Sequence, residues 1–296
     1  MQNHTSLDFF FNELRQRPGL IPVSIDVATN SIQWMDLEKY HFYEGFFHRS
    51  VKMFTALKRG DVFTCTTSTD VLLNDNIITD YVYPTAFIFH AGRCGSTLLA
   101  KVLARVQDNL IISEPDPLNN IHLLFNQGEF GQSGSEHKTA YRNLILAMAR
   151  RRVSSHQNVI VKFTSYNIRF FDFIHAVFPD VPAIFLTQDV DQIVKSCKKS
   201  RPGWLDSNNP EFVQLLADGA DSDIENIVRG FINKAANCPS EALKHVAYND
   251  LTPDNLPSIL GLLNVKANDK NMELMKTQFL YDSKKDVNRK VFQPGS

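Results

Sequence analysis

Residues 86–99 read AFIFHAGRCGSTLL, and this stretch decides the expected fold. Its first four residues form a short apolar run, which is typical of a strand buried on both faces. Glycines follow at positions 92 and 95, and the hydroxyl residues Ser96 and Thr97 open an apolar helical segment. A strand, a glycine-containing loop and a helix in this order turn free backbone N–H groups and the positive end of the helix dipole toward one point. The stretch therefore predicts an anion-binding loop.

An ordinary strand-to-helix turn with a Ser or Thr cap would show the same glycines. The buried strand before the loop and the added charge of Arg93 favour phosphate binding over that alternative. The loop of nucleoside triphosphatases, GxxxxGK[ST], would need glycine at 90 and lysine at 96, where this chain has His90 and Ser96. A kinase that uses ATP or GTP is therefore the weaker interpretation.

The segment GRCGSTLL, residues 92–99, resembles the 5′-phosphosulfate loop of the sulfotransferase family, whose members carry PRSGTT-like or KSGTT-like versions. The resemblance implies 3′-phosphoadenylyl sulfate as donor, adenosine 3′,5′-bisphosphate as product, and no metal. It places Arg93 at the bridging or leaving oxygen and Ser96 and Thr97 at the 5′-phosphate. The whole loop is expected to bind the donor, through Gly92, Arg93, Cys94, Gly95, Ser96 and Thr97, with Cys94 in place of the usual serine.

Further apolar runs follow the loop, and helical stretches alternate with them. The runs cover residues 109–112, 158–163, 183–186 and 245–248, and the helical stretches cover 97–106, 135–153, 169–178, 190–198 and 224–236. This alternation predicts an α/β fold, a P-loop three-layer sandwich with a central parallel sheet of about five strands flanked by helices. Ligands of such sheets bind beyond the carboxyl ends of the strands.

Glu114 comes directly after the second of these strands, in the sequence SEPDP. Sulfuryl transfer to an alcohol requires removal of the acceptor proton, which a positioned glutamate can accomplish. Tyrosyl-protein and bacterial sulfotransferases are similar in having a catalytic glutamate at this place. The alternative is that Glu114 caps the next helix. Further candidates for the base are Asp116, His90, His122 and His137.

Lys162 ends the otherwise apolar strand NVIVKF. A lysine in an apolar layer is costly unless it reaches a charge. The tyrosyl-protein sulfotransferases are similar here, so Lys162 is expected to stabilise the charge that moves to the leaving phosphate. The alternative is a lysine that extends to the sheet edge.

Gln188 stands where the family's 3′-phosphate site has an arginine, eight residues before the matching Ser196. A charge-assisted hydrogen bond contributes about 1.5–3 kcal/mol and a neutral one about 1 kcal/mol. The loss of charge would therefore weaken donor binding unless a cation nearby substitutes for it. The candidates for that role are Lys195, Lys198, Lys199 and Arg201, and the tail residues Lys284 and Arg289 are weaker ones.

The composition indicates a soluble globular protein. The 296 residues include 31 Lys and Arg against 32 Asp and Glu, which argues against a nucleic-acid surface. No apolar run is long enough to span a membrane, the N-terminus lacks a signal-peptide pattern, and the four cysteines have no paired spacing. A cytoplasmic location is expected. Residues 1–80 are expected to form an N-terminal extension and residues 84–296 the sulfotransferase-like domain.

Together these features predict a sulfotransferase that moves a sulfuryl group in line, without a metal, to a hydroxyl-bearing acceptor. A carbohydrate, phenol, peptide or natural product would serve as acceptor. The predicted catalytic residues are Glu114, Lys162 and Arg93, and Gln188 and Ser196 join the loop in donor binding. A P-loop phosphotransferase and a non-catalytic binding protein with the same fold are the alternatives.

Overall fold

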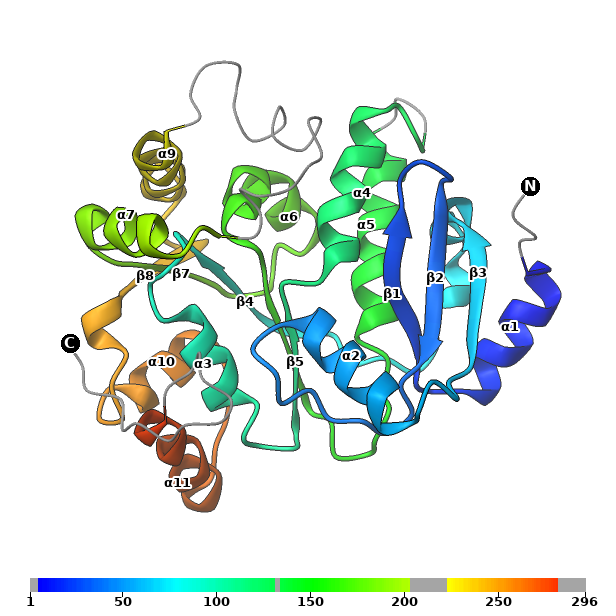
Figure 1. Ribbon diagram of the computed structural model, residues 1–296, viewed down its shortest axis with the longest axis horizontal. Helices are drawn as coiled ribbons and strands as arrows, with labels where there is room; N and C mark the ends of the chain where they lie inside the picture. Colours follow the sequence, from blue (N-terminus) through cyan, green and yellow to red (C-terminus); the bar gives the residue numbers. More distant parts are fainter. Residues whose placement is uncertain (1–4, 131–133, 203–222, 282–296) are drawn as a thin grey trace. The chain divides into compact units, whose positions relative to one another are not determined.

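The computed structural model describes residues 5–130, 134–202 and 223–281 (Figure 1). It contains a five-stranded sheet in the order β5-β6-β4-β7-β8, in which β4 pairs with β7 and β7 with β8 in parallel. These strands are β4 Pro84–His90, β5 Asn109–Ser113, β6 Asn158–Lys162, β7 Ala183–Thr187 and β8 Leu243–Ala247. Helices connect them, which confirms the predicted α/β class with a central parallel sheet of five strands.

The order of the strands singles out the end of β4. The chain forms β5 and β6 on one side of β4 and then β7 and β8 on the other. In open α/β sheets this reversal point is where ligands bind. The loop after β4, residues 91–95, is therefore at the place that the topology favours.

Most of the helices predicted from the sequence are present in the structure, but many of them begin or end at other residues than predicted. They are α1 Leu7–Gln16, α2 Phe47–Leu57, α3 Ser96–Leu103, α4 Asp116–Asn126, α5 Gly134–Met148, α6 Phe171–Val177, α7 Val190–Lys199, α9 Ile224–Ala236, α10 Leu256–Leu262 and α11 Asp269–Thr277. Helix α9 covers the expected residues. The stretch expected as a helix over 169–178 begins instead as a 3₁₀ turn, η3 Ser165–Phe170.

The chain divides into two compact units. The first consists of residues 1–84 and 106–161, and the second of residues 85–105 and 162–296. The first contains a second sheet, β1 Leu20–Asp26, β2 Ser31–Asp36 and β3 Thr64–Ser68, with antiparallel pairing throughout. The sequence pattern missed β1 and β2, and in β1 Pro22 interrupts the strand signal. A register shift between Pro22 and Ser24 accommodates the proline.

In the first unit β1 packs against α4 and α5 (Figure 1). Asn120 on α4 donates to the Ile25 carbonyl at 2.8 Å, and Trp34 on β2 donates through Nε1 to Thr67 Oγ1 at 2.9 Å. The indole of Trp34 is fully buried against Phe10 of α1, with ring centroids 4.7 Å apart. Residues before position 80 therefore share a core with residues after position 115.

Apolar residues between Glu38 and Lys58 recur at spacings of three and four, which predicts an amphipathic helix over residues 38–58. This prediction was wrong in its first half. Helix α2 begins at Phe47, because the backbone turns at Glu38, whose φ is +49°, and the Glu38 N–H donates to Asp36 Oδ1 at 2.9 Å. The apolar spacing before Phe47 belongs instead to a connection that buries Phe42. A three-or-four spacing of apolar residues cannot distinguish the two.

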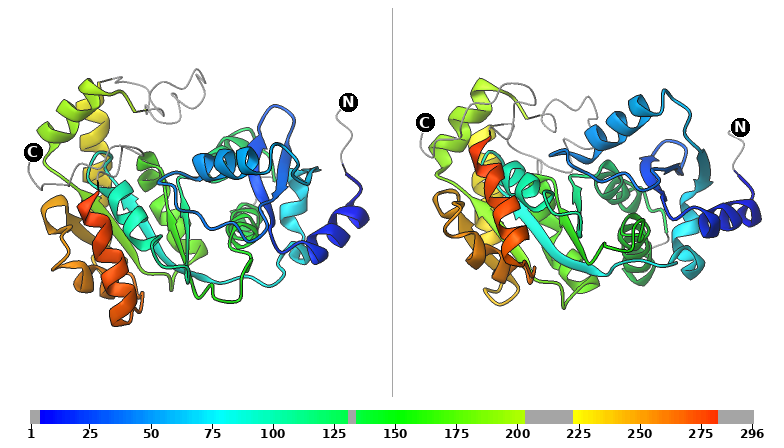
Figure 2. Two further views of the ribbon diagram at one scale, coloured as in Figure 1. Left: turned by 60° about the horizontal axis from the view of Figure 1, so that its bottom comes forward. Right: turned by 90° about the horizontal axis from the view of Figure 1, so that it is seen from below.

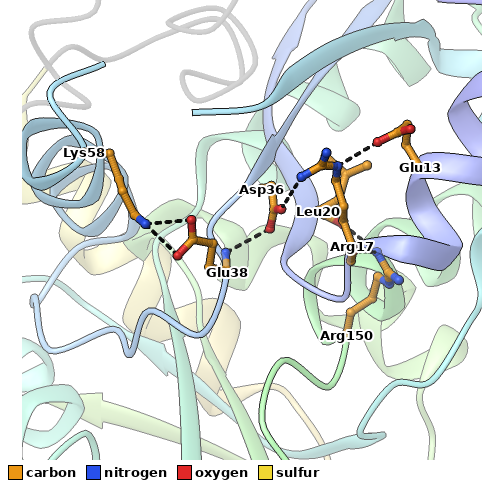
Figure 3. Close-up of polar contacts among 7 residues, drawn as sticks. All are labelled: Glu13, Arg17, Leu20, Asp36, Glu38, Lys58 and Arg150. Atoms are coloured by element: carbon orange, nitrogen blue, oxygen red, sulfur yellow. Dashed lines mark hydrogen bonds and ion pairs between the residues drawn. The ribbon is translucent and has the colours of Figure 1, made fainter. Parts of the chain in front are cut away.

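Charged side chains join α1, β2 and α2 in a row (Figure 3). Lys58 contacts Glu38 at 2.7 Å, while Arg17 contacts Asp36 at 3.3 Å and Glu13 at 2.7 Å. The outer pair is well exposed, with side-chain exposures of 37% for Lys58 and 53% for Glu38. Exposed ion pairs of this kind contribute about 0–1 kcal/mol.

Arg150 is a buried arginine that contacts the same part of the chain. Its guanidinium donates to the carbonyls of Arg17 at 3.0 Å, Leu20 at 2.8 Å and Leu14, at the end of α1 (Figure 3 draws the contact with Leu20). Burial lowers the pKa of Arg150 to about 10, which leaves it charged at neutral pH. One side chain therefore donates to two carbonyls at the end of α1 and to the carbonyl of the first residue of β1.

We expect Arg150→Ala to lower the free energy of unfolding by about 3 kcal/mol, because each buried carbonyl left without a donor costs about 1–3 kcal/mol. Lys58→Ala is the matched control in the same unit, with an expected loss below about 1 kcal/mol. Guanidinium denaturation of the two variants measures the difference. Equal losses would contradict the role given to Arg150.

His122 on α4 is buried beside Tyr141, with ring centroids 5.2 Å apart. Burial lowers the pKa of His122 to about 3. Because unfolded histidine takes up a proton near pH 6.5 and folded His122 does not, stability present above pH 6.5 falls as the pH drops toward 3. We expect His122 to contribute about 3 kcal/mol to the loss of stability between pH 6.5 and 4, and His122→Phe to remove that contribution. Denaturation curves at the two pH values measure it, and an unchanged loss in the variant would refute the assignment.

The second unit contains the strands beside the loop. Phe87 and Phe89 of β4 pack on Phe163, with ring centroids 5.2 and 4.7 Å apart, and Phe87 also contacts Phe178. These aromatic rings form a layer against β4, the strand that leads into the loop.

Helix α3, which follows the loop, contacts α11, and both views of Figure 2 show the two helices side by side.

Candidate anion-binding site

The loop after β4 contains three residues in the left-handed region. The φ angles are +85° at Gly92, +52° at Arg93 and +81° at Gly95. A Cβ on Gly95 would lie 2.8 Å from Leu251 Cδ2 and 3.0 Å from the ring of Tyr248, so glycine is required there for space as well as for φ. Such backbone turns its N–H groups inward and forms anion-binding concavities.

Gly95 is also the N-cap of α3, the helix that Ser96 and Thr97 open. Glycine has no side chain that could cap the first-turn N–H groups. Ser96 is buried and Thr97 half-buried. The start of α3 therefore has the backbone arrangement that binds phosphate at helix N-termini.

His90 is the last residue of β4 and contacts the loop that follows it. The Gly92 N–H donates to His90 Nδ1 at 3.0 Å, and Ser165 Oγ lies 3.3 Å from the same nitrogen. Both side chains are buried, at 3% exposure each. The Gly92 N–H is thus directed at the histidine.

Cys94 faces the sheet. Its side chain is fully buried, and Sγ lies 3.2 Å from the Leu186 carbonyl, which also accepts from the Ala91 N–H at 3.0 Å. Burial raises the pKa of the Cys94 thiol to about 12, against the opposing effects of nearby backbone groups and of the Lys162 charge. Cys94 is therefore a protonated, unreactive thiol at neutral pH, and it anchors the loop to β7.

Lys162 ends β6 and is fully buried. Its charge acts on the Cys94 thiol, so Lys162 lies within electrostatic range of the loop. Phe163, the next residue, donates its N–H to the Ile88 carbonyl of β4 at 2.9 Å. A buried lysine in this position is expensive to desolvate, a cost that binding of an anion would offset.

Helix α7 is joined to the loop through Arg93. The Arg93 guanidinium donates to the Ser200 carbonyl and lies 3.3 Å from Ser200 Oγ, at the C-cap of α7. Ser196 is half-buried on this helix, and Asp189 caps its start by accepting from the Gln192 N–H at 3.2 Å. The structure thus brings Arg93 and the α7 segment together.

Gln188 is half-buried directly after β7. The four basic residues named as substitutes for its missing charge are exposed at the end of α7 and just after it: Lys195, Lys198, Lys199 and Arg201. Lys284 and Arg289 lie outside the described residues. Gln188, Ser196 and these four cations all belong to the second unit, as the loop does.

Glu114 belongs to the first unit and follows β5. It is half-buried, and its backbone has a φ of +50°, which costs a residue other than glycine about 1–3 kcal/mol. Helix α4 has Pro115 as its N-cap and no side-chain hydrogen bond there. Strain of this kind is concentrated at functional sites.

The surroundings of Glu114 include residues from the N-terminal part of the chain. Ser113 donates through Oγ to the Gly45 carbonyl at 2.7 Å, just before α2. Desolvation raises the pKa of Asp116, His48 on α2 opposes that rise, and the charge of Glu114 adds to it. His48, Glu114 and Asp116 therefore form one titratable cluster, which the sequence did not indicate because His48 is far away in the chain.

The structure adds one residue to the loop's surroundings that sequence reasoning missed. Ser165 follows Lys162 by three positions, and its Oγ would lie 3.2 Å from a Cβ on Gly92. A polar residue just after a strand that ends in lysine was the available sequence signal for Ser165.

Among the described residues, no group of three His, Cys, Asp or Glu is placed to hold a metal ion. No helix in this part of the chain has the length and apolar character to cross a membrane.

No protein-family model and no curated protein matches the sequence. Among solved structures, the chain is similar to sulfotransferase STF1 from Mycobacterium tuberculosis H37Rv, with 12% identity, a TM-score of 0.44 and 94% of each chain covered. It is similar to the sulfotransferase domain from the curacin biosynthetic pathway, with 13% identity, a TM-score of 0.41, and 68% of this chain and 80% of that chain covered. Mouse sulfotransferase SULT7A1 complexed with PAP shows 14% identity, a TM-score of 0.39 and 75% coverage of each chain. All three are sulfotransferases, the family that the loop sequence resembles.

Proposed function

We propose that the protein is a sulfotransferase that moves a sulfuryl group from 3′-phosphoadenylyl sulfate to an acceptor hydroxyl. The observation that carries the proposal is the left-handed loop of Gly92, Arg93 and Gly95 next to fully buried Lys162. This pairing combines backbone N–H groups with a desolvated positive charge, which suits a phosphosulfate. The loop lacks the lysine at position 96 that a nucleoside triphosphatase uses.

In the proposed reaction, the acceptor oxygen forms a bond to sulfur while the bond from sulfur to the bridging phosphate oxygen breaks. Glu114 takes the acceptor proton, and the electron pair of the broken bond stays on the phosphate of adenosine 3′,5′-bisphosphate. Lys162 and Arg93 stabilise the charge that develops there, and N–H groups of the loop hold the 5′-phosphate. Ser96 and Thr97 contribute hydroxyls, and Gln188 and Ser196 lie at the 3′-phosphate.

Residues 84–296 form the sulfotransferase-like domain in this proposal, with residues 1–80 as an N-terminal extension. The acceptor is a carbohydrate, phenol, peptide or natural product with a free hydroxyl. A reducing cytoplasmic location is supported by the four cysteines, which are all buried free thiols.

One observation favours a second candidate, a binding protein without catalysis. Gln188 removes the charge that the family uses at the 3′-phosphate, and donor affinity would fall if nothing replaced it. Transfer of ³⁵S from labelled donor to a mixed library of hydroxyl compounds, in the presence of EDTA, tests the enzyme directly. Labelled product supports the proposal. Product formation only from labelled ATP and Mg²⁺ would assign a phosphotransferase instead.

Gln188→Arg is expected to tighten binding of adenosine 3′,5′-bisphosphate by about ten- to a hundredfold, because a neutral hydrogen bond becomes a charge-assisted one. Thr187→Arg, one residue earlier, is the matched control for added charge and is expected to have a smaller effect. Calorimetric titration measures both. Unchanged affinity in Gln188→Arg would show that another cation, among Lys195, Lys198, Lys199 and Arg201, already fills the role.

A further inference from the structure

We propose that His90 is the positioning residue of the anion-binding loop and holds it in the conformation that binds the donor. This inference rests on the proposed function, since it assumes that the loop binds the donor's phosphosulfate. His90 does not touch the donor in this account. It acts through the Gly92 N–H, the first turn of the loop.

The hydrogen bond fixes the proton of His90. A backbone N–H can only donate, so Nδ1 of His90 accepts from Gly92 at 3.0 Å and carries no proton. The neutral ring therefore has its proton on Nε2, and Ser165 is the donor in its 3.3 Å contact with Nδ1. Two donors from different segments thus converge on one nitrogen.

Burial makes this arrangement a restraint on the backbone. His90 and Ser165 are each 3% exposed, so water does not readily replace either partner. Gly92 has a φ of +85° and is followed by Arg93 at +52°, two angles that the loop must keep in order to present its later N–H groups. The bond to His90 holds the first of these angles, and Ser165 fills the space next to Gly92 where a Cβ would lie.

Protonation of His90 would oppose this geometry. With a proton on Nδ1, two donors would face each other and the Gly92 bond would be lost. The titratable and charged groups on the surrounding segments are Lys162 of β6, Arg93 and Cys94 of the loop, Lys101 of α3 and Tyr248, whose ring borders Gly95. Strand β7 contributes none, since it reads AIFLT. The neutral ring is therefore the form of His90 that holds the loop.

Two variants separate this role from simple filling of space. His90→Asn places an amide oxygen close to the position of Nδ1, where it accepts from Gly92 but does not titrate. His90→Phe keeps a ring and removes the acceptor. We expect His90→Asn to bind adenosine 3′,5′-bisphosphate within about threefold of the wild type at pH 8, and His90→Phe to bind at least about tenfold more weakly.

Rescue by the conservative variant is the discriminating measurement. Affinity is measured by calorimetry at pH 8, where the proteins differ in whether residue 90 can accept from the Gly92 N–H. Retained affinity in His90→Asn together with weakened binding in His90→Phe supports the positioning role. Wild-type affinity in His90→Phe, or equal losses in both variants, would overturn the proposal.

A ligand-free measurement separates this proposal from the proposed function. The ¹⁵N shifts of the His90 ring in the unliganded wild type report which nitrogen carries the proton. An unprotonated Nδ1 at pH 8, together with slow exchange of the Gly92 amide, supports the bond even if adenosine 3′,5′-bisphosphate does not bind. A protonated Nδ1 at that pH would refute the role of His90 whether or not the donor binds.

Discussion

Glu114→Gln is expected to lower the turnover of sulfuryl transfer by about 10²–10⁴-fold while leaving affinity for adenosine 3′,5′-bisphosphate nearly unchanged. The amide keeps the size and hydrogen-bonding reach of the carboxylate but cannot accept the acceptor proton. The half-buried side chain and the strained φ of +50° are both retained in this variant. The measurement is a turnover assay with labelled donor, together with calorimetry of the product nucleotide.

Asp116→Asn is the matched control, because Asp116 lies within electrostatic range of Glu114 and is exposed. It is expected to change turnover by less than about tenfold. A large loss in Asp116→Asn with full activity in Glu114→Gln would move the base to Asp116. Equal, small effects in both variants would remove this cluster from the mechanism.

Lys162→Met is expected to lower turnover by about 10²–10³-fold, since in the proposed reaction its buried charge stabilises the leaving phosphate. Donor affinity should fall less, because the charge of the leaving group grows only as the sulfur–oxygen bond breaks. Thermal unfolding is compared with that of the wild type, so that a loss of turnover is distinguished from a loss of folded protein. Turnover, product affinity and thermal unfolding are measured on one preparation.

Lys244→Met serves as the control for loss of a lysine from the same sheet, since Lys244 is exposed on β8. It should leave turnover, binding and stability unchanged. If Lys162→Met kept full turnover, the lysine would be a structural residue. If it unfolded the protein, Lys162→Arg, which retains the charge, would be the variant to compare.

The loop could be predicted because its local signals agree with the fold. Gly92 and Gly95 occupy positive-φ positions, and the apolar run before them is buried in β4. Sequence reasoning found Lys162 by the same route, as one charge at the end of an apolar strand. Each of these signals lies within a few residues of the site that it predicts.

Contacts between distant segments could not be predicted in this way. The pairing of His90 with Ser165 joins residues 75 positions apart, and no local pattern marks it. The approach of Gly45 to Ser113 joins residues 68 apart. The start of α2 was wrong for a local reason, because the turn at Glu38 forms a hydrogen bond to Asp36 only two residues earlier, and apolar spacing does not report it.

Calorimetric titration of the wild type with adenosine 3′,5′-bisphosphate, at pH 8 and with EDTA present, tests the central claim most directly. We predict saturable binding at one site per chain, and no competition by millimolar ATP. Gly95→Val should lose this binding, because its Cβ would lie 2.8 Å from Leu251 Cδ2 and its φ would be unfavourable. The absence of measurable binding by the wild type at millimolar ligand would contradict the assignment of the loop to a sulfotransferase donor.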